Sequence, residues 1–425
     1  MLRLVIAILV VLLIYFSYQL FRDDPLLPEA QAWLKLTEQQ PDLENNAIIY
    51  LLGLNLTGAD YANALQRYQQ AMQDKTYQSS PLHYPGLPDL KTLELETLNC
   101  QLAMPECQQL LLVKRQETEL VIQQYQAIIA AFYQLVNFDN FANLDTFITE
   151  PQFDELTKLY RLAANEIYYL ITDNKLDKAA AKLTALLTIE RSLMRNSGEM
   201  TLHVLPIIHT ESLYQPLFIK LQHASFTEWA VFDTALAPLS NTERLMNKVW
   251  QYEFANQANS INSILPATEQ STIVFKPNMT INMLTQFYQT LTLNPDILPT
   301  EFQAQIAHSE KLNTAFRQKA KVASQPWRIA IYNYRNVVGS LMVYTTVPRF
   351  LDLLKPKLEL DLRLHLLHAM VHEVSAAELN TERYRNPYTG QPPYLNEGQL
   401  CHKLEQEICV PWPHGQQPTL TPTEL

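Results

Sequence analysis

Residues 151–196 read PQFDELTKLYRLAANEIYYLITDNKLDKAAAKLTALLTIERSLMRN and carry the clearest helical pattern in the chain. Apolar residues recur every three or four positions in both halves, and the polar pair Asp173 and Asn174 interrupts the pattern between them. The apolar positions are Phe153, Leu156, Leu159, Tyr160, Ala163, Ile167 and Leu170, followed by Leu176, Ala179, Ala180, Leu183, Leu186, Leu187 and Leu193. This segment predicts a helical hairpin.

The rest of the chain indicates more helices but no regular repeat. The hairpin is similar in length and in its small packing residues to a tetratricopeptide-like unit, yet no second copy follows at a fixed period. The chain has only 8 glycines beside 25 prolines, roughly a quarter of the usual glycine content, so it lacks the residues for the tight turns of a large β protein. A hydrophobic content of 47% is enough for one large core or two smaller ones. We therefore predict a mostly α fold, an irregular helical array.

The N-terminal residues have the composition of a membrane anchor. The run Leu4–Phe21 is almost wholly apolar, and as a helix it would span roughly 27 Å, close to the thickness of the hydrocarbon core of a bilayer. Arg3 precedes the run and Asp23 and Asp24 follow it, which places the N-terminus in the cytoplasm. We predict a single-pass transmembrane signal anchor over residues 1–22, contact with the bacterial inner membrane through residues 4–21, and a periplasmic C-terminal body.

A cleaved signal peptide is the alternative interpretation of the same run. Such a peptide needs a shorter apolar region followed closely by a small-x-small cleavage site. The nearest such pair, Ala30 and Ala32, lies well beyond the run and behind Pro25 and Pro28. The length of the run and the position of this pair favour a retained anchor.

The four cysteines form two close pairs in sequence, Cys100 with Cys107 and Cys401 with Cys409. An even number of cysteines in local pairs is typical of disulfides formed in an oxidising compartment. We predict both bridges, which agrees with a periplasmic location. A single metal site made from all four thiolates is the alternative.

The predicted organisation beyond the anchor has three parts. Residues 23–380 form the periplasmic α-helical domain, for which we consider a division into subdomains 29–198 and 199–380. Residues 381–415 form a small C-terminal region with a disulfide-linked β-hairpin, because Cys401 and Cys409 lie symmetrically about Glu405. The tail, residues 416–425, is rich in proline, threonine and glutamine and is predicted to be disordered.

Three stretches carry a resemblance to a group of proteins. They are Asn46–Leu54, the pair Cys100 and Cys107 that leads into a long helix, and the turn Asn386–Gly390. Together they look like landmarks of uncharacterised membrane-anchored proteins of Gram-negative bacteria. The resemblance implies an inner-membrane anchor and a periplasmic body. It implies no catalytic residue, because no activity is attached to that group.

One constellation has the residue types of a metal site. Asp361, His365, His368 and His372 are spaced by four, three and four residues, so they fall within roughly 60° of one another on a helix. Three imidazoles and a carboxylate on one face suit zinc or copper. The alternative, which we favour, is that they form the solvated or hydrogen-bonded side of an otherwise apolar helix. The zinc-protease motif His-Glu-x-x-His is not completed, because Ala376 occupies its last position.

Other classes of site find little support in the sequence. The net charge of −11 argues against nucleic acid as a partner, and we predict no cofactor. Glu211-Ser212 and Tyr332-Asn333 resemble fragments of lytic transglycosylase motifs, but the residues that should follow each pair are missing. No Gly-x-Ser-x-Gly or Ser-x-x-Lys nucleophile motif occurs.

The sequence therefore predicts a non-enzymatic interaction or scaffold module of the cell envelope, with an unidentified envelope protein or polymer as its partner. The alternative is a periplasmic hydrolase, metal-dependent through His365, His368 and His372.

Overall fold

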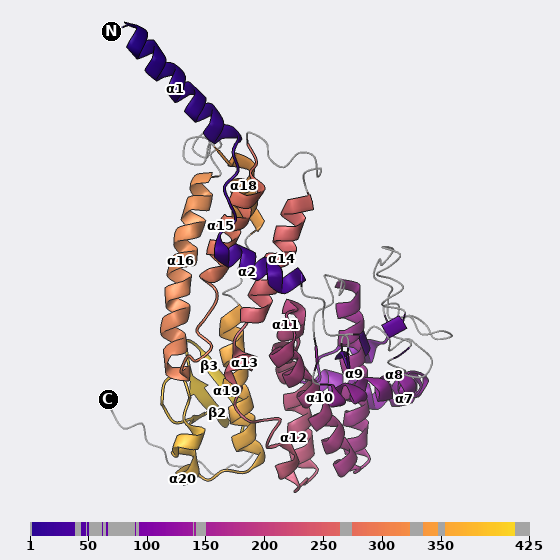
Figure 1. Ribbon diagram of the computed structural model, residues 1–425. Helices are drawn as coiled ribbons and strands as arrows, with labels where there is room; N and C mark the ends of the chain where they lie inside the picture. Colours follow the sequence, from indigo (N-terminus) through magenta and orange to yellow (C-terminus); the bar gives the residue numbers. More distant parts are fainter. Residues whose placement is uncertain are drawn as a thin grey trace. The chain divides into compact units, whose positions relative to one another are not determined.

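The computed structural model describes residues 2–38, 44–47, 49–50, 62, 65–66, 90, 93–138, 140–141, 150–263, 274–323, 335–346 and 353–412. These residues are mostly helical and include one small antiparallel sheet, which confirms the predicted fold class at that level (Figure 1). They form two compact units. Unit 1 contains residues 1–40, 245–297 and 301–354, and unit 2 contains residues 41–244, 298–300 and 355–425. Each unit therefore draws on stretches far apart in the sequence.

The N-terminal helix α1, Leu2–Phe21, is 20 residues long. Every side chain from Ile8 to Tyr15 is between 46% and 68% exposed. Within the described residues, no helix combines the length and the apolar character that crossing a membrane requires.

The described residues of unit 1 also form the helices α2 (Pro28–Glu38), α14 (Asn247–Ser263), α15 (Pro277–Gln289), α16 (Phe302–Ala323) and α18 (Val337–Thr346). Its core includes the buried rings of Trp250, Phe254, Phe287 and Tyr288. Trp33 of α2 meets Phe254 edge to face, with ring centroids 5.2 Å apart. Aromatic packing thus joins the segment after α1 to the middle of the chain.

Asp23 connects the end of α1 to the start of α15. Its carboxylate accepts hydrogen bonds from the backbone N–H groups of Asn278 at 2.9 Å and Met279 at 3.2 Å. These N–H groups have no partner inside the helix, and a negative charge is favourable at a helix N-terminus. The neighbouring Asp24 pairs with Arg335 at 2.9 Å. The acidic doublet after the apolar run is therefore part of the packing of unit 1.

Gly339 allows α18 to approach α15 closely. A Cβ atom at this position would lie 1.9 Å from Oγ1 of Thr280. Thr280 Oγ1 accepts a hydrogen bond from Nδ2 of Asn336 at 3.0 Å, and Asn336 Oδ1 accepts one from the backbone N–H of Lys276 at 2.8 Å. Only a residue without a side chain fits beside this network.

Unit 2 is built around α9 (Glu150–Thr172) and α10 (Leu176–Asn196), which contact each other as the predicted hairpin requires. The turn contains Asn174 at φ 58°, a left-handed conformation that asparagine tolerates better than most residues. Elsewhere in the described part of unit 2, the helical elements include α5 (Glu96–Asn99), α6 (Pro105–Val113), α7 (Arg115–Gln124), α8 (Gln126–Tyr133), the 3-10 helix Gln134–Asn137, α11 (Met200–His209), the π-helix Thr210–Tyr214, α12 (Gln215–His223), the 3-10 helix Trp229–Phe232, α13 (Asn241–Arg244), α19 (Leu354–Val371), α20 (Ala376–Leu379) and the 3-10 helix Glu382–Tyr384.

A buried ionic network joins α10, α13 and α19. Arg191 donates to both carboxylate oxygens of Glu243, at 2.9 and 2.8 Å. Burial would raise the pKa of Glu243, but the hydrogen bonds and charge of Arg191 outweigh it and hold the pKa below its ordinary value. Lys357 donates to Nδ1 of His203 at 2.7 Å and to the backbone carbonyl of Glu243 at 2.5 Å. Burial lowers the pKa of Lys357 to about 7.

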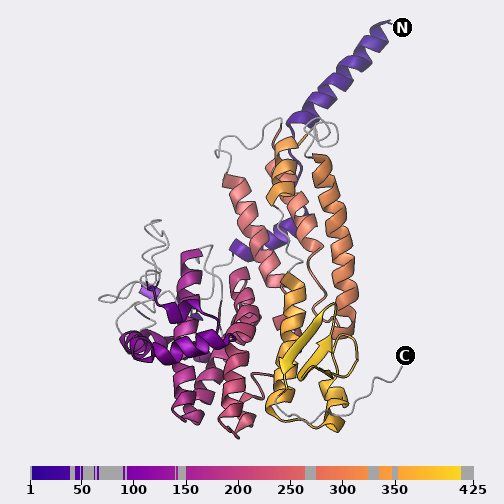
Figure 2. The same cartoon turned by 180° about the vertical axis from the view of Figure 1, so that it is seen from behind.

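The C-terminal sheet contains β1 (Tyr394–Asn396), β2 (Gln399–Lys403) and β3 (Glu407–Pro411), in the order β1-β2-β3. Cys401 lies opposite Cys409 in the antiparallel register, and a disulfide joins them, as predicted. The sheet lies beside α19 (Figures 1 and 2), where the ring of His402 stacks on that of His365 at 5.5 Å. The strand β1 adds to the predicted hairpin.

Several predictions concern residues outside the described part of the chain. They include the tail 416–425 and most of Asn46–Leu54. The division of residues 23–380 at position 198 stays a prediction, and the two compact units observed here are not continuous in sequence.

Candidate metal centre

The histidine stripe lies on α19, which has little contact with solvent. His365 and His368 are both only 6% exposed, so their rings have hydrogen-bond partners in the protein rather than water around them. His372 follows the last residue of the helix, and its side chain is 26% exposed. The stripe therefore runs from the interior of unit 2 toward its surface.

His368 and His372 converge, and a residue that the sequence did not indicate joins them. Oδ1 of Asp233 lies 2.7 Å from Nε2 of His372 and 3.6 Å from Nε2 of His368. One ligand atom from each of the three residues lies within 4.8 Å of the others. Asp233 follows the short 3-10 helix Trp229–Phe232, whose rings pack into the core. Its side chain is 52% exposed, so the cluster opens to solvent on this side.

The protonation state of His368 suits a metal ligand. Burial, followed by the nearby His372 and Arg383, lowers the pKa of His368 to about 4. The imidazole is therefore neutral at neutral pH, which is the form that binds a metal ion.

Two neighbours fix the tautomer of His368. Arg383 approaches Nε2 at 3.3 Å, and Tyr384 approaches Nδ1 at 3.3 Å with its hydroxyl. A guanidinium group only donates hydrogen bonds, so Nε2 accepts with its lone pair and Nδ1 carries the proton that it donates to Tyr384. The lone pair on Nε2 is the one that a cation at this cluster would need.

The two remaining residues of the predicted stripe, Asp361 and His365, lie on α19 and bind other partners. His365 donates from Nε2 to the backbone carbonyl of Arg383 at 2.6 Å, and its ring stacks on that of Tyr384 at 5.7 Å. Asp361 accepts hydrogen bonds from the backbone N–H of Leu239 at 2.6 Å, from Nε of Arg244 at 2.8 Å and from the hydroxyl of Tyr388 at 2.5 Å. The carboxylate of Asp361 is therefore paired with Arg244, and Asp361 is not among the residues that converge with His368 and His372.

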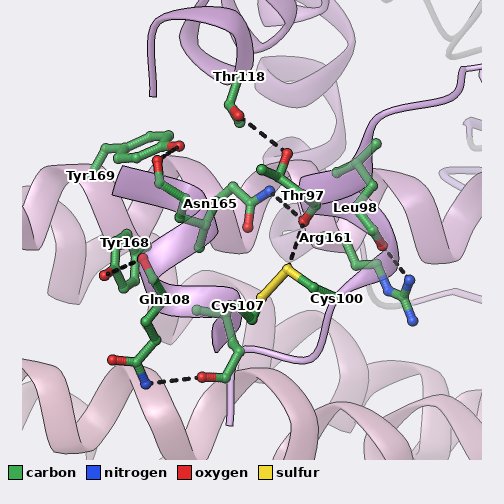
Figure 3. The surroundings of a disulfide bond; sticks show 12 residues. Thr97, Leu98, Cys100, Cys107, Gln108, Thr118, Arg161, Asn165, Tyr168 and Tyr169 are labelled. Carbon is green, nitrogen blue, oxygen red and sulfur yellow. Dashed lines mark hydrogen bonds between the residues drawn. A yellow bond between two sulfur atoms is a disulfide. The ribbon is translucent and has the colours of Figure 1, made fainter. Parts of the chain in front are cut away.

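The cysteines offer no thiolate, because all four are in disulfides. Figure 3 shows the bridge between Cys100 and Cys107, which ties the loop before α6 to the first turn of that helix. Asn165 of α9 donates to the carbonyl of Thr97 at 3.2 Å, and Tyr169 donates to that of Leu111 at 2.9 Å. The four-thiolate metal site is therefore wrong, and this pair is structural.

The transglycosylase-like fragments do not form a site among the described residues. Glu211 lies in the π-helix with a side chain that is 66% exposed, and it pairs with Arg363 at 3.3 Å. Tyr332-Asn333 falls outside the described residues. The structure thus leaves Asp233, His368 and His372 as the strongest candidate site.

Comparison with known proteins gives no further guide to the function. No protein-family model matches the chain, and neither curated proteins nor solved structures give a match. Any function has to be argued from the residues themselves.

Proposed function

We propose that this protein is anchored in the bacterial inner membrane by one helix and that its helical body serves as an interaction or scaffold module in the periplasm. The observation that carries the anchor is the exposure of α1. Eight consecutive residues, Ile8–Tyr15, point in all directions around a helix at 100° per residue, and all of them are exposed. A helix that lay on a protein surface would bury one face, whereas a helix that is apolar all round belongs in a large core or in lipid.

Charge and cysteines support the orientation. Arg3 precedes the apolar run, and the acidic pair Asp23 and Asp24 follows it. The positive-inside rule then leaves the body on the periplasmic side. Disulfides persist in that oxidising compartment and are rare in the cytoplasm.

Membrane fractionation of the full chain tests the anchor. We expect the protein in the membrane fraction, extractable with detergent but not with alkaline carbonate. Val11→Lys together with Leu12→Lys should release it, because each lysine costs roughly 2.5 to 3.5 kcal/mol at the centre of a membrane helix. Ile208→Lys with Val231→Lys, two exposed apolar positions in unit 2, is the matched control and should stay bound. Release of the unmodified protein by carbonate would contradict the proposal.

A reporter that is active only in the periplasm, fused after Leu425, tests the orientation. We expect an active fusion. A stable but inactive fusion would place the body on the other side of the membrane.

The interaction role has its best support in unit 2 near the first disulfide. Leu112 and Val113 at the end of α6 are 52% and 74% exposed, Met104 directly before α6 is 52% exposed, and Leu120 in α7 is 60% exposed. Exposed apolar side chains at adjacent positions, such as Leu112 and Val113, are typical of protein-binding surfaces. We propose an envelope protein with a complementary apolar surface as the partner.

Cross-linking in intact cells tests this role. A photo-reactive residue at position 112 should give a discrete cross-linked protein, and Val113→Ser should weaken that product. The same residue placed at position 231 should not give it. No product at position 112, or the same product at both positions, would count against this surface.

A metal-dependent hydrolase is the second candidate, and the convergence of Asp233, His368 and His372 is the observation that favours it. It predicts hydrolysis of an envelope ester or peptide that a chelator abolishes and that Asp233→Asn removes. Hydrolysis that persists with a chelator present and in the Asp233→Asn variant would exclude this candidate.

A further inference from the structure

We propose that Asp233, His368 and His372 bind one divalent transition-metal ion, with zinc as the best fit. Metal binding is independent of the interaction role, and it is a precondition of the hydrolase candidate. Two imidazole nitrogens and one carboxylate oxygen form a donor set of intermediate softness, which suits zinc, whereas calcium and magnesium prefer oxygen alone.

The distances require only small adjustments. Tetrahedral zinc with ligand bonds of about 2.0 to 2.1 Å places its ligand atoms roughly 3.3 Å apart. Oδ1 of Asp233 already lies 3.6 Å from Nε2 of His368 and 2.7 Å from Nε2 of His372. Asp233 and His372 are partly exposed and have room to move, whereas His368 is buried and held by Tyr384.

His372 provides a second observation. Its Nε2 is buried and has no hydrogen-bond partner among the described residues, although the carboxylate of Asp233 lies only 2.7 Å away. The nitrogen and the carboxylate oxygen thus lie 2.7 Å apart without a hydrogen bond between them. Two ligands of a common cation adopt this kind of arrangement.

The surroundings contain one supporting and one opposing group. The hydroxyl of Tyr384 accepts from Nδ1 of His368, the kind of outer contact that orients a histidine ligand. Arg383 places a positive charge 3.3 Å from Nε2 of His368, where it competes with a metal ion. Its residue is exposed, so the side chain has space to withdraw when an ion binds. Removing this charge should therefore strengthen metal binding.

The number of ligands distinguishes the type of site. Three protein ligands leave one tetrahedral position for water, and the exposed Asp233 lies at the solvent side. Such an open position is typical of catalytic zinc, whereas structural zinc usually has four protein ligands. A metal-bound water at this position is the group that a hydrolase would use.

The test is zinc titration of the full chain in detergent after treatment with a chelator, using calorimetry and a competing zinc indicator. We expect one zinc per chain. Asp233→Asn and His372→Gln should each weaken binding at least tenfold, and both are near the surface, so circular dichroism should show an unchanged fold. Cobalt should give an absorption band in the visible range that both variants lose.

Two further variants make the test specific. His223→Gln is the matched control, because it changes an exposed histidine of unit 2 that is not part of the cluster, and zinc affinity should stay the same. Arg383→Gln should tighten binding roughly two- to fivefold, the range expected for one exposed charge interaction. The proposal is overturned if the unmodified protein binds no stoichiometric zinc, if Asp233→Asn binds as well as the original, or if His223→Gln loses the ion.

Discussion

Arg244 donates a hydrogen bond from Nε to Oδ2 of Asp361 at 2.8 Å, and the two side chains are only 7% and 1% exposed. The hydroxyl of Tyr388 donates to the same carboxylate oxygen at 2.5 Å. Burial lowers and Asp361 raises the pKa of Arg244, and the net shift is upward, so Arg244 stays positively charged in the folded state. This pair ties the end of α13 to the middle of α19.

Removing one charge of this pair should strongly destabilise the folded protein. We expect Arg244→Met to lower the free energy of unfolding by roughly 3 to 5 kcal/mol, because it leaves the carboxylate of Asp361 buried and unpaired. The double variant Arg244→Met, Asp361→Leu should recover most of the loss. Glu211→Gln, which breaks an exposed pair with Arg363, should cost less than about 1 kcal/mol. Urea unfolding measures all three, and an additive double variant would show that the pair is not coupled.

The disulfide between Cys401 and Cys409 should stabilise the sheet. Its loop is short, and the chain-entropy estimate for a bridge of this size is on the order of 2 to 3 kcal/mol. Replacing both cysteines with serine should lower the free energy of unfolding by about that amount. Peptide mapping without reductant should recover Cys401 with Cys409 and Cys100 with Cys107. Free thiols in protein purified from envelopes would contradict these pairings.

His402 should make the protein less stable in acid. Burial, followed by the nearby His365, lowers the pKa of His402 to about 3, whereas histidine in an unfolded chain titrates near 6.5. Above pH 6.5 both forms are neutral and the contribution of His402 is complete. As the pH falls from 6.5 toward 3, only the unfolded chain takes up the proton, so stability falls by at most ~1.4 kcal/mol per pH unit.

The variant His402→Phe should flatten this part of the stability curve in the presence of a chelator. His223→Phe, at an exposed histidine of unit 2, should leave the slope unchanged. Urea unfolding at pH 7 and pH 5 separates the two outcomes. An equal slope in His402→Phe and the original protein would mean that His402 takes up its proton in the folded state.

Gly339 provides a prediction for unit 1. Gly339→Ala should destabilise the protein by roughly 1 to 3 kcal/mol, the usual cost of overpacking, because the new methyl group would meet Thr280. Thr280→Ala removes the clashing hydroxyl, so the double variant should lose less than the sum of the two single changes. Thermal unfolding followed by circular dichroism checks the cycle. Additive losses would show that the clash is relieved in some other way.

Local patterns in the sequence predicted the elements that depend on neighbours along the chain. The hairpin of α9 and α10 follows from helical spacing on each side of Asp173 and Asn174. The pairing of Cys401 with Cys409 follows from their symmetric spacing in a hairpin. The strand β1 was missed, although Glu397 and Gly398 at positive φ form the two-residue turn that joins it to β2.

Long-range contacts account for what the sequence did not predict. The long helix expected after the pair Cys100 and Cys107 is divided near Lys114, where the carbonyl of Leu111 accepts a hydrogen bond from the hydroxyl of Tyr169. Asp233 belongs to the metal cluster only because folding brings it to α19, and no spacing rule connects it to His368. Helical spacing pointed instead to Asp361, whose carboxylate forms an ion pair with Arg244.

The interleaving of the two units also determines the order in which the molecule can assemble. Helix α2 contacts α14 and α15 within unit 1, yet roughly 200 residues separate its end from the start of α14. At a synthesis rate of about 5 to 20 residues per second, that interval lasts roughly 10 to 40 s. During this time α14 and α15, which contact α2 and Asp23 in the folded protein, have not yet been synthesised, whereas most of unit 2 has been. The first segment of unit 1 is therefore synthesised before unit 2, but unit 1 can fold only after the second half of the chain has been synthesised.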